Sequence, residues 1–166
     1  MILTPNQKNF LWNKVNVIPG TEGETMDMAK SKLTMHNPFI KELVFQENEI
    51  FECADKQITL NNAFSLSLKI NNRKHQAFAA LRWVIGTKNS SPFCVNFTMC
   101  TTVEWDDVDK ETLNHFLSVD TAVALLSYMR PVVSSITGQS KYPAYYLPLV
   151  DLHTNTLENC EVTYVE

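Results

Sequence analysis

The histidines and acidic residues are the first places in this sequence to look for catalytic or metal-binding chemistry. Four histidines fall in four separate segments: His36, His75, His115 and His153. None has the spacing of a metal-ligand motif such as HExxH. The acidic stretch EWDDVDKE, residues 104–111, superficially resembles a calcium loop, but counted from Asp107 its sixth residue is Thr112 and its twelfth is Ser118. We therefore expect no metal site. The acids are expected to lie in the connection before a helix, where negative charge favours the helix N-terminus.

Nucleophile and phosphate-binding motifs are absent as well. The four cysteines form no CxxC pair: Cys53, Cys94, Cys100 and Cys160. We expect them to be reduced and mostly buried. No GxSxG or GxxxxGK[ST] motif occurs, and four glycines in the whole chain cannot support a dinucleotide-binding loop. The sequence thus predicts a protein that is not an enzyme and holds no cofactor.

An aromatic run is the most informative feature: Tyr142, Tyr145 and Tyr146, followed by Leu147. Tyrosine supplies large, rigid contact area with one polar end. Two interpretations stay open, because such a run either packs on its own domain or marks an interaction surface.

Composition limits the other function classes. The chain has 166 residues, 45% of them hydrophobic and 19% charged, as expected for one globular domain. Its net charge of −4 offers no basic excess for nucleic acid. We find neither a signal peptide nor a run of about 18 apolar residues, so we predict a cytoplasmic protein without membrane insertion.

Hydrophobic periodicity predicts the elements that must position these residues. Residues 1–33 are expected to form a partly ordered arm, and 153–166 a polar tail whose EVTYV segment is a candidate short strand. Between them, residues 34–152 are expected to form an α+β domain. Strands are predicted at 39–47, 64–71, 77–85 and 93–105; a short helix at 108–117 and a longer helix from an Asp120 N-cap to Thr137 follow. Short connections predict a four-stranded antiparallel meander, with both helices packed on its apolar face.

In this order the segments resemble the SecB protein-export chaperones. The resemblance is carried by PFIKELVFQEN, by the meander ending in FCVNFTMCTTVEW, by ALLSYMRPVVSSIT with its Tyr-x-Arg step, and by YYLPLVDL. It covers residues 34–152. It implies a SecB-like holdase that binds unfolded polypeptide clients, serves protein export and assembles as a dimer of dimers.

The resemblance also implies roles for individual residues. Client binding is expected at Phe39, Trp83, Tyr142, Tyr145, Tyr146 and Leu147. Support of the oligomer interface is expected at Phe93, Val95, Phe97 and Met99. SecA docking is expected at Glu42 with Glu47, although Gln46 and Asn96 stand where the family has two further acids.

That departure motivates a second hypothesis, a SecB-fold binding module for one dedicated partner, such as a member of a toxin–antitoxin pair. A third hypothesis, an enzyme or a small-ligand carrier, would need a cavity with convergent polar groups between sheet and helix.

Overall fold

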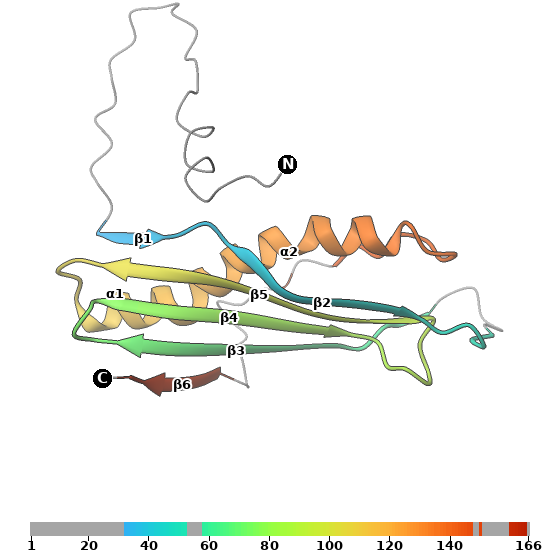
Figure 1. Cartoon of the computed structure of the whole chain (residues 1–166), viewed down its shortest axis with the longest axis horizontal. Helices are drawn as coiled ribbons and strands as arrows, with labels where there is room; N and C mark the ends of the chain where they lie inside the picture. Colours follow the sequence, from blue (N-terminus) through green and yellow to red (C-terminus); the bar gives the residue numbers. More distant parts are fainter. Residues whose placement is uncertain (1–31, 53–57, 148–149, 151–159, 166) are drawn as a thin grey trace, which may run out of the picture. The chain divides into compact units, whose positions relative to one another are not determined.

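One six-stranded sheet, covered on one face by a single helical run, forms the described part of the protein (Figure 1). This computed structural model describes residues 32–52, 58–147, 150 and 160–165, which belong to the unit Ser31–Glu166. The predicted arm, apart from its last two residues, and most of the predicted tail lie outside the described residues. The strands are β1 (Leu33–Met35), β2 (Phe39–Glu47), β3 (Asn62–Asn71), β4 (Gln76–Ile85), β5 (Phe93–Trp105) and β6 (Cys160–Tyr164).

The predicted meander is confirmed, but the predicted strand number of four is wrong. β3, β4 and β5 pair antiparallel in sequence order, and β2 pairs antiparallel with β5. Two further strands extend the sheet. β5 is 13 residues long, so one edge of it has room for both β2 and β1, and β1 pairs with its last three residues. β6 pairs in parallel with β3 at the other side of the sheet. A three-residue strand shows no periodicity, so no sequence pattern indicated β1. The candidate strand in EVTYV is confirmed as β6, but its parallel pairing with β3 had no local signal.

The helices α1 (Lys110–His115) and α2 (Thr121–Thr137) form one continuous run, joined by the π-helical segment η2 (Phe116–Asp120). The predicted cap at Asp120 is wrong, because this residue has helical backbone angles and makes no side-chain cap bond. The cap is Asp109, whose carboxylate accepts a hydrogen bond from the Thr112 N–H at 2.9 Å. This bond holds the pKa of Asp109 below its usual value.

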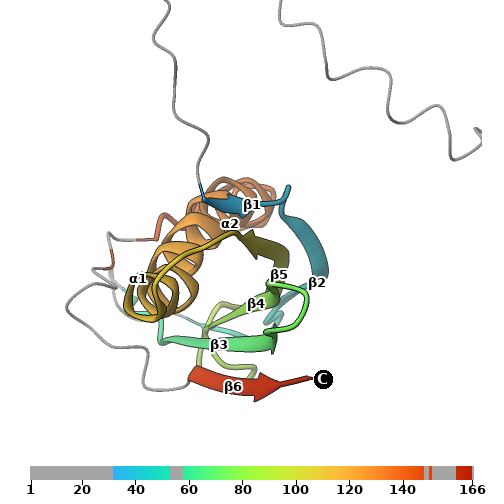
Figure 2. The same ribbon diagram turned by 90° about the vertical axis from the view of Figure 1, so that its left-hand side faces the viewer.

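The core lies between α2 and the sheet, as Figure 2 shows in end view. Alternate residues of β3, β4 and β5 point to the helix and are buried, with Trp83 and Phe97 fully enclosed. The helix contributes Leu125, Met129 and Val133, also fully buried. By length and composition alone Lys110–Thr137 could cross a membrane. Its apolar side, however, packs on the sheet as in the core helix of a globular domain.

The turn between β4 and β5 depends on Gly86. Its φ of +68° lies in the left-handed region, and an added Cβ would collide with the Phe93 carbonyl oxygen. We expect Gly86→Ala to lower the free energy of unfolding by about 1–3 kcal/mol in a denaturant titration. Gly138→Ala is the control for backbone conformation, because Gly138 has ordinary helical angles. An added Cβ there would lie 3.1 Å from the Ser134 carbonyl oxygen, a tight contact but a milder one than the collision at Gly86, so a smaller loss is expected. Equal losses in both variants would contradict a conformational role for Gly86.

Candidate functional site

An aromatic cluster forms where the loop after α2 meets the start of β5. Phe93, the first residue of β5, lies 6.3 Å from the Tyr142 ring and 6.4 Å from the Tyr145 ring, centroid to centroid. Phe45 of β2 lies 5.7 Å from Phe93. Phe51, which follows β2, approaches Tyr142 edge-on at 6.4 Å. We call these five residues the aromatic cluster.

Hydrogen bonds attach the loop to the sheet. The side-chain amide of Asn62 donates to the Tyr145 hydroxyl at 2.9 Å, and its oxygen accepts from the Trp83 indole N–H at 3.0 Å. The Tyr145 backbone N–H donates to the Thr137 hydroxyl at 2.9 Å. Tyr145 is therefore held at both its backbone and its ring, and one amide connects it to the core.

A second attachment lies at the end of β2. The Glu47 carboxylate accepts a hydrogen bond from the Lys141 backbone N–H at 3.2 Å, and the Lys141 ammonium lies 5.2 Å from the centre of the Tyr142 ring. Among the described residues the buried Tyr142 hydroxyl has no hydrogen-bond partner. Strand, loop and ring are thus held together by polar contacts.

Next to these fixed rings, apolar side chains are open to solvent. Tyr146 is 76% exposed, and Ile50, which precedes Phe51, is 89% exposed. Leu147 is half-buried and packs on the core. A rigid aromatic base with exposed apolar neighbours can bind scattered apolar side chains of another polypeptide without any reaction.

The structure brings together four of the six residues predicted to bind clients. Tyr142, Tyr145, Tyr146 and Leu147 occupy one loop. Trp83 is fully buried and has no surface to offer. Phe39 lies on the opposite face of the sheet, 6.3 Å from Phe78.

The four residues expected to support the oligomer lie in the core. Phe93, Val95, Phe97 and Met99 are at most 5% exposed. They face α2, so any part they play in assembly would act through the helix that they support.

The two acids predicted for docking lie on different faces. Glu42 pairs with Thr98 on the face opposite α2, whereas Glu47 pairs with Phe93 and faces the helix side. Gln46 and Asn96 share the face of Glu42, and Asn96 accepts a hydrogen bond from Arg82 Nε at 2.8 Å.

Sequence reasoning missed Phe51 and Asn62 as parts of the site. Phe51 lies outside any regular element, and the contact between Asn62 and Tyr145 spans 83 positions. No pattern in the neighbouring sequence could have indicated that either residue belongs to the site.

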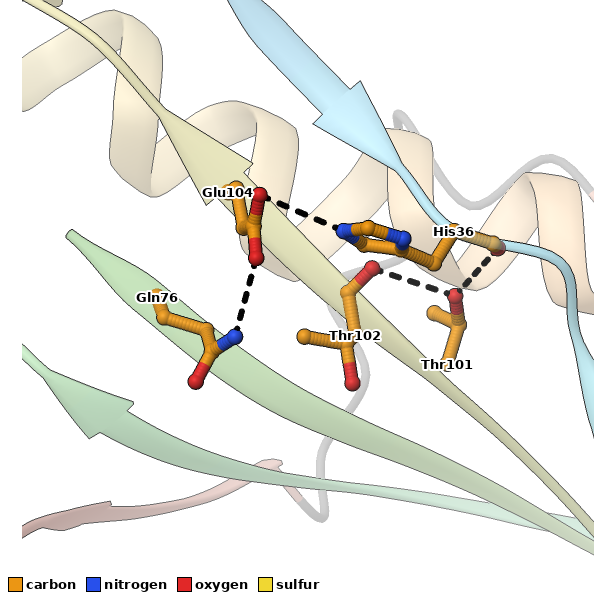
Figure 3. Close-up of polar contacts among 5 residues, drawn as sticks. All are labelled: His36, Gln76, Thr101, Thr102 and Glu104. Atoms are coloured by element: carbon orange, nitrogen blue, oxygen red, sulfur yellow. Dashed lines mark hydrogen bonds and ion pairs between the residues drawn. The ribbon is translucent and has the colours of Figure 1, made fainter. Parts of the chain in front are cut away.

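A polar cluster lies at the other end of β5, as Figure 3 shows. His36 Nε2 lies 3.3 Å from a Glu104 carboxylate oxygen, and the Gln76 amide donates to the other oxygen at 3.0 Å. The Thr101 hydroxyl donates to the His36 carbonyl at 2.7 Å. These bonds hold the connection between β1 and β2 against β5. No group of three or more metal-binding side chains occurs in the part of the chain that the structure describes.

Comparison with known proteins identifies a family. The family model described as preprotein translocase subunit SecB matches residues 26–156. No curated protein sequence matches the chain.

Two solved structures are similar in fold. One is the Mycobacterium tuberculosis SecB-like chaperone Rv1957 in complex with a ChAD peptide from the HigA1 antitoxin; it is 14% identical, with a TM-score of 0.58, over 72% of this chain and 91% of that chain. Another is a Streptococcus agalactiae protein of unknown function, 12% identical, with a TM-score of 0.46, over 73% of this chain and all of that chain.

Removing the Asn62 amide tests how the loop is held. We expect Asn62→Ala to lower the free energy of unfolding by about 1–3 kcal/mol, because the buried Trp83 N–H loses its acceptor. Asn61→Ala is the matched control, since the Asn61 backbone carbonyl accepts from the Gly86 N–H whichever side chain it carries. Thermal or denaturant unfolding measures both. An Asn62→Ala loss no larger than the Asn61→Ala loss would contradict the role of this amide.

Proposed function

The chain belongs to the SecB family, and on that premise we propose that it is a cytoplasmic holdase chaperone that binds unfolded or non-native polypeptides. Members of this family are chaperones rather than enzymes. We propose accordingly that binding proceeds without a catalysed reaction and without a cofactor.

The aromatic cluster and the exposed Tyr146 carry this proposal. Non-native chains expose apolar side chains in no fixed pattern, so a binder needs a broad apolar surface that tolerates different partners. Rings held by Asn62, Thr137 and Glu47 lose little conformational entropy when a client binds. Tyr146 then offers a large contact area at a small entropic cost.

We also propose that the protein forms a homo-oligomer, a dimer of dimers, and that the outward side of α2 forms one of its interfaces. Ser127, Tyr128, Pro131 and Ser135 are exposed on this side. Arg130 is the only charged residue between Thr121 and Thr137. A surface helix normally carries charged residues on its solvent side, so an almost uncharged outward side favours contact with another chain.

A second candidate function is binding of one dedicated partner. Two observations favour it. The SecB-like chaperone of similar fold is bound to an antitoxin peptide, and Gln46 and Asn96 replace two acids expected for SecA docking. On this view the chain would serve a toxin–antitoxin pair or a similar client, and a role in export with SecA would not follow.

Suppression of aggregation tests the holdase proposal. We expect stoichiometric protein to suppress aggregation of a reduced, unfolded client, measured by light scattering. Tyr146→Ala should weaken suppression without lowering stability, because the ring is 76% exposed. Tyr164→Ala, which removes a 66% exposed ring on β6, should leave it unchanged. Failure to suppress aggregation of any client would refute the proposal, and recovery of one folded partner in a pull-down would favour the second candidate.

Solution mass tests the oligomer. We expect multi-angle light scattering to give about four times 19.0 kDa for the wild type. Tyr128→Arg should dissociate it, because a charge at the centre of the outward side of α2 would have to be desolvated in the contact. Tyr164→Arg serves as the control with the same change elsewhere. A tetramer that persists in Tyr128→Arg would place the interface on another surface.

A further inference from the structure

The face of the sheet opposite α2, which we call the outer face, carries a groove of about 750 Å³. The groove forms because small side chains stand next to one another on three neighbouring strands. The strand register places Ser67, Ala80 and Cys100 side by side on β3, β4 and β5. Its charged lining residues are Lys41, Lys69, Arg82 and Glu161.

Longer side chains stand on either side of this row. On one side of the row, two residues further along β3 and β4, Lys69 pairs with Phe78. On the other side Arg82 of β4 lies between Ser65 of β3 and Thr98 of β5. Lys41 adds a third cation from β2, at the register shift between Ile40 and Glu42. Burial raises the pKa of the Cys100 thiol, and Lys41 lies close enough to offset part of this rise.

These cations form a local positive patch on a protein of net charge −4. Among the described residues Glu161 is the only carboxylate lining the groove, and Glu42 lies at its β2 end beside Thr98. No described acidic side chain forms an ion pair with Lys41, Lys69 or Arg82. Arg82 donates from Nε to Asn96, and within the described residues its two terminal nitrogens remain for a ligand.

The positive charge and the apolar lining residues of the groove together indicate the chemistry of its ligand. Carboxylates suit the arginine fork and the two ammonium groups, whereas Phe78 and Ala80, with Phe39 at the margin, offer apolar contact. Nucleic acid fits less well, because the carboxylates of Glu161 and Glu42 border the positive patch on two sides and would repel phosphates.

We propose that the outer-face groove binds an acidic, extended segment of a partner polypeptide. This site lies on the face of the sheet opposite the one that packs on α2. It is therefore separate from the aromatic cluster and does not depend on client binding there.

Fluorescence anisotropy with a labelled peptide of alternating glutamate and phenylalanine tests the proposal. A peptide with lysine in place of glutamate is the reference ligand. We expect the acidic peptide to bind more tightly, with an affinity that falls as salt rises. Lys69→Glu and Arg82→Glu should each weaken binding about tenfold or more, through the loss of a charge-assisted bond.

Lys110→Glu is the matched control, since it makes the same charge change on α1, on the other side of the sheet. It should leave the affinity within about twofold, and Tyr146→Ala should do the same. Arg82→Gln replaces Arg82→Glu if thermal unfolding shows that the latter does not fold. Equal binding of both peptides, no binding of the acidic peptide, an equal loss in Lys110→Glu, or stronger binding of a single-stranded oligonucleotide would each overturn the proposal.

Discussion

Coverage of one apolar sheet face by a single helix is the constraint on which this structure depends. The helix-facing residues of β3, β4 and β5 form a continuous apolar surface that water would otherwise contact. α2 supplies the complementary side, and Leu125, Met129 and Val133 are buried without remaining exposure. The π-helical segment keeps α1 and α2 in one run, so cover extends along the sheet without a break.

Because these apolar side chains form the core, we propose recognition of other chains at surfaces that the core does not use. The residues that the family resemblance linked to assembly, such as Phe97, serve as core, and so does Trp83. The contacts proposed with other chains use the end of the sheet, the outward side of α2 and the outer face. These three surfaces differ in chemistry, being aromatic, uncharged and basic respectively, and each suits a different kind of contact.

Polar groups decide how rigid these surfaces are. Asn62 satisfies the Trp83 indole inside the core and the Tyr145 hydroxyl at its margin, so the stability of one depends on the position of the other. On the outer face, β6 brings Glu161 beside Ser67, and the chain's last strand therefore forms one end of the basic groove. The sheet is thus completed by segments from both ends of the described chain.

The sequence by itself determined the meander, the helical region and the aromatic loop, because strand alternation, helical spacing and a tyrosine run are local patterns. Only the tertiary structure decided that Phe39 lies on the other face of the sheet and that Trp83 is enclosed in the core, that the sheet has six strands, and that Lys41, Lys69 and Arg82 share a groove. Register is the physical reason. A shift of one residue reverses the face of every side chain after it, and the irregularity between Ile40 and Glu42 sets those faces on β2. Such pairings join residues far apart in the chain, which periodicity cannot detect.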